Sequence, residues 1–201
     1  MVDLWRRFSK DPSCFEVVVA VDGDDVESVK AAKAIDQCKV VVQEDLPGNC
    51  VKGWNLAARN SSGQVLIAIS DDFYPIRNWD QRILSVADRH WVDRRHVVMV
   101  NDGHTRDLCT LPIVTRARYN ELGYLFYPGY ESMYCDTELT RHAELDGIVI
   151  RAMNLVFTHH HPDNMMRMKD HVDLNHSNGD RYTRGERLFE QRRAKGFPKD
   201  L

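Results

Sequence analysis

Two acidic clusters follow apolar stretches of this sequence. Asp22-Gly23-Asp24-Asp25 comes after Glu16 to Val21, and Asp71-Asp72 comes after Val65 to Ile69. Both runs are short and apolar, which predicts strands buried on both faces of a parallel sheet. Ligands of open α/β sheets bind beyond the carboxyl ends of the strands, so we expect these carboxylates at one edge. A hard divalent cation, magnesium or manganese, would compensate their charge and could bridge a diphosphate.

Aspartate also has common structural roles. Asp24 or Asp25 can cap the helix predicted from about Val26 to Ile35, and Asp71 or Asp72 can begin a turn. For the first pair we favour capping. For the second pair, two adjacent carboxylates directly after a buried strand favour a functional site.

A third candidate is Asp136, in a helix predicted from Tyr134 to Leu145. Asp136 shares a helical stripe with Leu139 and Ala143, whereas Glu138 is turned away, so only one of these carboxylates is expected to face an interior cleft. A partly desolvated aspartate has a raised pKa and could take the proton of an acceptor hydroxyl. The N-cap of this helix is the alternative role for Asp136.

Three adjacent histidines, His159, His160 and His161, follow the apolar stretch from Ala152 to Phe157. Side chains alternate in an extended segment, which predicts His159 and His161 on one face and His160 on the other. Metal ligation and an unliganded surface cluster both remain open, and such a cluster could also bind zinc adventitiously.

The order of predicted elements indicates an α/β fold. Further helices are expected at Val2 to Phe8, Cys50 to Arg59, Asn78 to Arg89 and Arg116 to Leu122, and further strands at Lys39 to Val42, His96 to Val100 and Ile148 to Phe157. Alternating buried strands and helices predict three α/β/α layers around a mostly parallel sheet, with a less regular second half.

Composition limits the function classes. With 201 residues, 43% hydrophobic, the chain can form one domain, expected at residues 1–163 and followed by a helical basic tail at 164–201, packed on the domain or extending from it. The net charge of −3 argues against a nucleic-acid-binding domain. Glu186 and Glu190 interleave with the basic residues from Arg181 to Lys199, which indicates a solvated amphipathic helix.

Cysteine usage and hydropathy indicate the cellular compartment of the protein. The five cysteines form no C-x-x-C pair, so neither a disulfide scaffold nor a structural zinc site is suggested. Neither a signal peptide nor an apolar run of about 18 residues is present. We therefore expect a soluble cytoplasmic protein.

The segment from Gly63 to Asp72 resembles family 2 and related GT-A glycosyltransferases, in which a glycine precedes a strand that ends in a D-x-D-type metal motif. Ser70 stands where the family often has aspartate. The resemblance implies that Asp72 contacts the metal, with Asp71 nearer the ribose or a metal-bound water. A histidine from the C-terminal region, His161 or His159, would complete the metal shell.

Other segments resemble the same family. Asn49-x-x-x-Gly53-Trp54-Asn55 is similar to the pattern N-x-G-x-x-x-A-R-N, which implies donor binding near Lys52 and Asn55. Asp22, with Asp24 beside it, corresponds to the aspartate that commonly bonds the uracil ring.

The downstream match begins at Gly123. That glycine, the run from Tyr134 to Arg141, and Gly147 resemble the segment G-G…E-D-x-D/E-L-x-x-R…G. The aspartate of its E-D pair is the catalytic base, which implies Asp136, with Cys135 in place of the glutamate.

One expected feature is missing from the match. GT-A domains normally open with a strand that bears a Pro-Ser/Thr-x-x-Arg-like turn, and Val2 to Phe8 looks like the helix after that strand. The chain would then be a fragment or late-start product, or another segment fills the position. A missing central strand would expose backbone groups of its neighbours and weaken the nucleotide pocket.

The resemblance implies a metal-dependent glycosyltransferase that moves a sugar from a nucleotide-diphosphate donor, UDP-linked by the Asp22 correspondence, to an unknown acceptor hydroxyl with inversion. Its cofactor would be Mn²⁺ or Mg²⁺. A degenerate GT-A nucleotide- or sugar-binding domain is one alternative. A sugar-1-phosphate nucleotidyltransferase is the other, and it would normally show a glycine-rich basic phosphate loop near its start.

Overall fold

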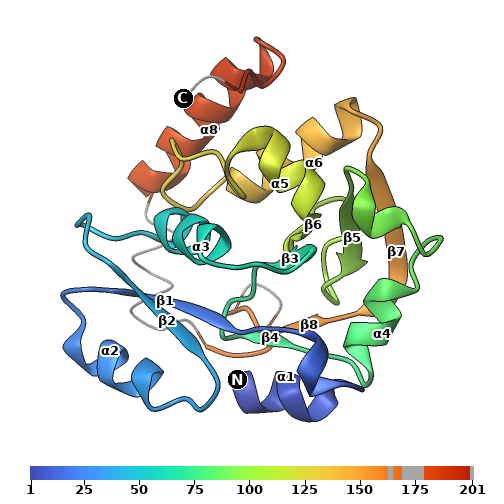
Figure 1. Cartoon of the computed structure of the whole chain (residues 1–201). Helices are drawn as coiled ribbons and strands as arrows, with labels where there is room; N and C mark the ends of the chain where they lie inside the picture. The colour runs from blue at the N-terminus through green and yellow to red at the C-terminus, as the bar shows by residue number, and fades with distance from the viewer. Residues whose placement is uncertain (163–164, 169–178, 200–201) are drawn as a thin grey trace.

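The computed structural model describes residues 1–162, 165–168 and 179–199 of the chain (Figure 1). The first part consists of α1 (Val2–Phe8), η1 (Pro12–Cys14), β1 (Val18–Asp22), α2 (Val26–Lys33), β2 (Lys39–Gln43) and α3 (Cys50–Arg59). The middle consists of β3 (Val65–Ile67), β4 (Phe73–Tyr74), α4 (Trp79–Leu84), η2 (Trp91–Asp93), β5 (Val97–Asn101), β6 (Ile113–Thr115) and α5 (Arg116–Leu122). The last part consists of α6 (Cys135–Leu145), β7 (Val149–Val156), β8 (Thr158–His159) and α8 (Gly179–Arg193).

The strands form three hydrogen-bonded groups. β1 and β2 form a parallel pair, β4 and β8 an antiparallel pair, and the largest group is a sheet in the order β3-β6-β5-β7. In that sheet β6 is antiparallel to β3 and β5, while β5 and β7 are parallel. Three of its four strands therefore run the same way, which confirms a mixed α/β fold with mostly parallel strands.

Side chains of β5 alternate between two cores. Val97 and Met99 belong to the core on one face, and Val98 and Val100 belong to the core on the other. The first core also contains Val51, Ala58, Leu139, Ala143 and Phe189, from α3, α6 and α8. The second also contains Trp5, Trp79, Ile83 and Trp91, from α1, α4 and η2. Helices thus cover both faces of the sheet (Figure 1).

Several elements differ from the prediction. The short strands β4, β6 and β8 were not predicted, because two or three residues carry too little periodicity to stand out. The helix predicted from Asn78 to Arg89 ends at Leu84 as α4. The Asp88 carboxylate accepts a hydrogen bond from the His90 N–H and pairs with Arg94, and this local turn competes with further helix.

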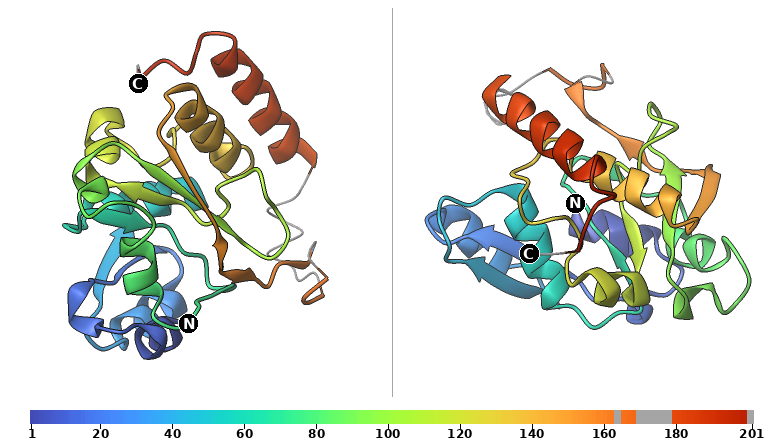
Figure 2. Two further views of the ribbon diagram at one scale, coloured as in Figure 1. Left: turned by 90° about the vertical axis from the view of Figure 1, so that its right-hand side faces the viewer. Right: turned by 90° about the horizontal axis from the view of Figure 1, so that it is seen from above.

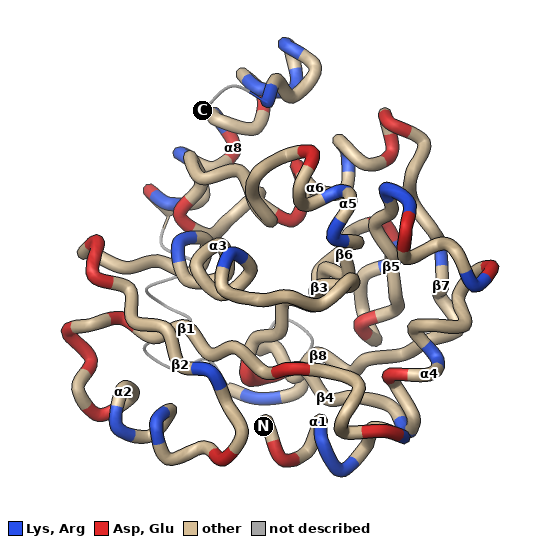
Figure 3. The backbone as a smooth tube through the Cα atoms, in the orientation of Figure 1, with Lys and Arg blue, Asp and Glu red and all other residues tan. Residues whose placement is uncertain are grey.

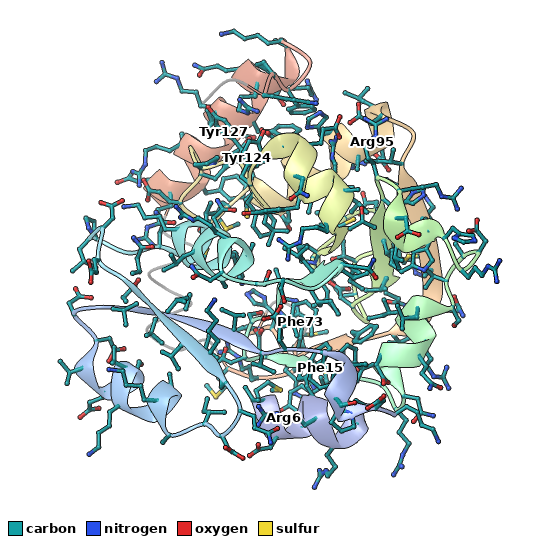
Figure 4. All side chains as sticks on the ribbon, in the orientation of Figure 1. Arg6, Phe15, Phe73, Arg95, Tyr124 and Tyr127 are labelled. Carbon is teal, nitrogen blue, oxygen red and sulfur yellow. The ribbon has the colours of Figure 1, made fainter. Side chains whose placement is uncertain are left out.

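A tryptophan anchors the amino-terminal helix. Trp5 of α1 donates its indole N–H to the carbonyl of Phe73 at 3.1 Å, and Trp79 donates to the carbonyl of Trp5 at 2.8 Å. The Trp5 ring also stacks on Phe157. Figure 4 shows Phe73 and Phe15 between the four-stranded sheet and α1. The helix is therefore fixed against the segment that follows β3.

The carboxy-terminal helix α8 packs against α6 (Figure 2). Arg192 donates from Nε to both carboxylate oxygens of the buried Glu138, at 3.0 and 2.8 Å, and Tyr130 donates its hydroxyl to the same carboxylate. Phe189 is buried beside them. The domain boundary predicted after residue 163 falls outside the described residues.

Candidate functional site

The pairing of β4 with β8 brings Asp72 to the histidine segment. Phe73 lies opposite His159, and their rings stack with centroids 4.0 Å apart. His159 Nε2 lies 3.1 Å from Asp72 Oδ2, and the His160 N–H donates to the Asp72 carbonyl at 2.8 Å. Two residues that sequence analysis selected separately, 87 positions apart, are therefore in direct contact.

Asp72 is ionised at neutral pH. Burial by itself raises the pKa of its carboxyl, but hydrogen bonds from His159 and from the Ser70 hydroxyl at 2.7 Å outweigh burial and lower the pKa to about 2. Ser70, which stands where the resembling family often has aspartate, thus helps to hold the Asp72 carboxylate in its charged form.

The other two histidines lie as the alternation of an extended segment predicts. His161 has its ring centroid 5.1 Å from that of His159, whereas His160 stacks on Tyr74 at 3.9 Å. Within the described part of the chain, no three His, Cys, Asp or Glu side chains are grouped closely enough to hold a metal. Asp72 and His159 are the closest pair of candidate ligands, and a metal-binding role for His161 remains a prediction.

Asp22 and Asp71 line one large cavity, of about 1180 Å³. Asn49 and Ser70 also line it. Desolvation and the nearby charges of Asp24 and Asp25 raise the pKa of Asp22, against the opposing effect of Lys52. The expectation that acidic residues following β1 and β3 face a common space is thus met by Asp22 and Asp71.

Gly48 approaches the Asp22 carboxylate so closely that a Cβ at this position would collide with it. Any other residue at position 48 would therefore displace the Asp22 carboxylate or move the loop after β2. Figure 3 shows acidic residues in the turn after β1 and in the loop after β2. The carboxylates at this end of β1 therefore lie in a region of concentrated negative charge.

The acidic turn after β1 contains a helix cap, as expected. Asp25 accepts a hydrogen bond from the Ser28 N–H at 2.9 Å and is the N-cap of α2. Asp24 is exposed in the same turn. A donor contact by Asp24 stays a prediction.

Lys52 and Asn55 of α3 hold neighbouring loops. Lys52 pairs with the Asp45 carboxylate at 2.8 Å. The Asn55 side chain accepts from the backbone N–H groups of Leu125 and Phe126 and donates to the Phe126 carbonyl at 2.7 Å. Those bonds give Asn55 a structural link to this loop, and a donor contact by Asn55 stays a prediction.

Asp136 lies in the first turn of α6 and is not its N-cap. The N-cap is Tyr134, which has a left-handed backbone conformation and makes no side-chain capping bond. Asp136 accepts from the Thr137 N–H at 2.7 Å. Desolvation is the main reason that its pKa is raised, and the charge of Asp102 adds to the effect.

The prediction that Glu138 turns away from the interior was wrong. Glu138 is buried, with an exposed fraction of 3%, because Arg192 of α8 and the Tyr130 hydroxyl bind its carboxylate. The helical stripe places Glu138 correctly relative to Leu139, but α8 covers a second side of α6. Asp136 is the half-buried member of the pair.

Asp102 is an additional acidic residue that sequence analysis did not select. It follows β5 directly, is buried, and accepts from the His104 N–H at 2.8 Å and the Thr110 hydroxyl at 2.7 Å. Its carbonyl accepts from the His159 N–H at 2.9 Å. The sequence feature that could have identified Asp102 is its position immediately after an apolar strand, the same pattern that identified Asp71 and Asp72.

Comparisons with known proteins give structural neighbours. The search found no matching family model and no matching curated protein. Two crystal structures of the glycosyltransferase TarS from S. aureus superpose with a TM-score of 0.62 at 15% identity. The matches cover 82% and 98% of this chain, and 34% and 69% of the TarS chains, the shorter of which comprises TarS residues 1–349.

The chain thus spans about a third of the first of these TarS structures. The similarity supports a glycosyltransferase fold for the described residues. Within the described residues, no helix is both long and apolar enough to cross a membrane.

Proposed function

We propose that this chain is a glycosyltransferase domain that binds a nucleotide-diphosphate sugar at the carboxyl ends of β1 and β3. The observation that carries the proposal is the Asp72–His159 contact of 3.1 Å, on a fold shared with TarS. Asp72 and His159 form a carboxylate–imidazole pair next to Asp71, which lines the cavity together with Asp22. Such a set of groups suits the binding of a metal ion with a diphosphate.

The residues present fit a magnesium or manganese ion. Such ions are often held by one or two protein groups, with substrate phosphates and water completing the coordination. In place of their mutual hydrogen bond, Asp72 and His159 would provide those groups, and a bound ion would offset the charge that develops on the departing diphosphate. Ser70 keeps the Asp72 carboxylate deprotonated through its hydrogen bond.

Asp136 is the proposed general base. Desolvation raises its pKa above that of a free aspartate, so its carboxylate holds a proton more strongly and can accept one from an acceptor hydroxyl. Attack by that hydroxyl on the anomeric carbon, opposite the departing diphosphate, breaks the bond to the leaving oxygen. The product sugar then has inverted configuration.

The donor's base and ribose are assigned to the acidic edge of the cavity. Asp22, whose pKa is raised mainly by desolvation, would accept hydrogen bonds from a uracil ring. Asp71 is exposed and lines the same cavity, where it would reach the ribose hydroxyls. We therefore expect a preference for UDP over GDP.

A domain that binds a nucleotide without transferring a sugar is the second candidate. The observation in its favour is the cavity itself, which lies between β1 and β3 and adjoins the proposed donor site. The strands β1 and β3 are not hydrogen-bonded to each other. They would therefore hold Asp22 and Asp71 less rigidly than catalysis requires.

Calorimetric titration of UDP and GDP, with and without manganese, tests the donor site. We expect manganese-dependent binding of UDP that Asp72→Asn and His159→Ala each weaken by about tenfold or more. Asp36→Asn, an exposed carboxylate on the loop between α2 and β2, is the matched control and should bind as the native chain does. Failure of the folded chain to bind either nucleotide would refute the proposal.

Asp136→Asn separates the two candidates. If the chain is an enzyme, this variant should bind UDP normally and release UDP from UDP-sugars at least about a hundredfold more slowly. If the native chain binds UDP and shows no turnover with any UDP-sugar, the binding domain is the better description.

A further inference from the structure

The loop between β5 and β6 contacts both ends of the proposed active site. This β5–β6 loop comprises residues 102–112. At its start, the Asp102 carbonyl accepts a hydrogen bond from the His159 N–H at 2.9 Å. Near its end, the Cys109 N–H donates to the Thr140 hydroxyl at 2.9 Å. The loop is therefore bonded to β8, which carries a proposed metal ligand, and to α6, which carries the proposed general base.

The Asp102 side chain closes this loop with three hydrogen bonds. Its Oδ1 accepts the backbone N–H groups of His104 and Thr105, at 2.8 and 2.5 Å, and its Oδ2 accepts the Thr110 hydroxyl at 2.7 Å. Asp102 is buried, and hydrogen bonds to a carboxylate are stronger than those between neutral groups. No residue from 103 to 107 is buried, so packing does little to fix this part of the loop. Its conformation therefore depends on the Asp102 carboxylate.

Thr140 links the end of the loop to the first turn of α6. Its hydroxyl accepts from the Cys109 N–H and donates to the Asp136 carbonyl at 2.7 Å, two roles that a single hydroxyl can fill. Thr140 is fully buried, so water does not compete for these bonds. The charge of Asp102 also lies close enough to raise the pKa of Asp136, although desolvation is the larger cause. The loop and the proposed base are thus neighbours in space as well as connected by hydrogen bonds.

The other end of this connection is the backbone of the histidine segment. β8 has only two residues, and its partner β4 is equally short. Strands of this length form few ladder bonds, so the bond from the His159 N–H to the Asp102 carbonyl is a large part of what fixes His159. Just before it, the Phe157 N–H donates to the Asn101 carbonyl at 2.8 Å. The end of β5 therefore places the imidazole of the proposed metal site.

We propose that Asp102 is a positioning residue, which sets the place of Asp136 relative to the Asp72–His159 pair by holding the β5–β6 loop in one conformation. The inference rests on the proposed function. In a single displacement, the attacking hydroxyl and the departing diphosphate lie on opposite sides of the anomeric carbon, so the base and the metal site must keep a fixed separation. A displacement of about 1 Å in such an arrangement can slow a reaction by about a hundredfold.

Asp102→Ala removes all three side-chain bonds and tests the proposal. We expect kcat for UDP release from a UDP-sugar to fall at least about fiftyfold, because the base is displaced. The Kd for UDP with manganese should change by less than about fivefold, since the bond to His159 comes from the backbone of residue 102 and is retained. Calorimetric titration with UDP counts the folded chains. A loss of stability alone would therefore lower the binding stoichiometry and leave the rate per bound UDP unchanged.

Three further variants sharpen the test. In Asp102→Asn, the amide oxygen accepts the two N–H bonds and the amide nitrogen donates to the Thr110 hydroxyl, so kcat should stay within about threefold of the native value. Asp107→Asn removes an exposed carboxylate of the same loop, which pairs with Arg141 at 3.6 Å, and is the matched control with native kcat. Thr110→Val removes one of the three bonds at nearly constant shape and should lower kcat about tenfold, which tests the loop even if Asp102→Ala does not fold.

Hydrogen exchange gives a readout that does not involve catalysis. The Cys109 amide should exchange at least about tenfold faster in Asp102→Ala than in the native chain, and at the native rate in Asp107→Asn. Equal exchange in these two variants would overturn the inference.

The kinetic outcomes separate this inference from the proposed function. Native kcat in Asp102→Ala or Thr110→Val, or a loss in Asp102→Asn as large as that in Asp102→Ala, would overturn the inference alone, because the native chain would still be active. A native chain that turns over no UDP-sugar would refute the proposed transfer and this inference with it.

Discussion

Two strands with the same kind of sequence have different surroundings in this molecule. Val97 to Val100 of β5 have exposed fractions of 0 to 2%, whereas all five residues of β1 are only half-buried. Both strands are apolar and rich in valine. β5 lies between β6 and β7, while β1 has β2 on one edge and the cavity on the other.

This difference shows that an apolar sequence makes a strand suited to burial. Whether the strand is buried depends on its neighbours. Burial of β5 requires partners on both edges and helices on both faces. β1 has α3 packed on it but has one partner among the described strands. We therefore expect the β1–β2 pair to be the less stable region of the native chain.

The largest expected effect is on hydrogen exchange. Amides of β5 should exchange at least about a thousandfold more slowly than those of β1, because β5 opens only with the core whereas one edge of β1 already faces a cavity. Exchange monitored by mass spectrometry or NMR measures the ratio. Similar protection of the two strands would show that the regions unfold together.

Two matched isoleucine truncations compare the regions energetically. Ile113→Ala, at a fully buried site in β6, should lower the free energy of unfolding by about 3 kcal/mol. Ile35→Ala, beside the cavity, should cost about 1 kcal/mol, because its half-buried side chain already borders open space. Urea unfolding gives both values, and equal costs would contradict the comparison.

Thiol labelling gives a smaller difference. Burial raises the pKa of the Cys109 thiol to about 11, which leaves little reactive thiolate at pH 8. Cys14 is exposed and Cys38 is half-exposed in the first part of the chain. We expect both to be alkylated at least about tenfold faster than Cys109, as measured by peptide mapping. Comparable labelling of Cys109 would mean that the region around β5 opens as readily as the region around β1.

Acid titration of Asp72 has the smallest expected effect. Its pKa is lowered to about 2 from the ordinary 3.8, so its stabilising contribution is present above about pH 4 and is lost as the pH falls to about 2. Asp72→Asn should remove about 1 kcal/mol of this pH-dependent stability, after allowance for solvent screening.

Urea unfolding at pH 5 and pH 2.5 measures the contribution of Asp72, with Asp36→Asn as the exposed control. If Asp72→Asn retained the full acid dependence of the native chain, the contact with His159 would not stabilise the fold. The test therefore measures how much the contact between Asp72, after β3, and His159 of β8 contributes to stability.

Local periodicity predicted much of the fold. The bounds of α3 and α5 were predicted as observed, and the predicted strands β1, β2, β3, β5 and β7 were located within two residues at each end. These elements are visible in sequence because a helix or a buried strand of five residues repeats its pattern. β6 has three residues, and nothing local distinguishes its antiparallel direction.

The candidate site was predicted as a set of residue types and not as an arrangement. Alternation predicted that His159 and His160 point to different sides. The helical stripe did not predict the burial of Glu138, because Arg192 reaches it from 54 residues away. A partner so distant in sequence leaves no trace in the periodicity of the helix itself.

The sequence alone determined which segments could be strands and helices and which side chains could carry acid, base and metal chemistry, because those properties are local. Only the tertiary structure decided that Asp72 contacts His159, that Asp22 and Asp71 share a cavity, and that β5 is buried while residues of β1 line that cavity. Strand pairing joins residues far apart in the chain, so contacts and burial follow from the whole fold.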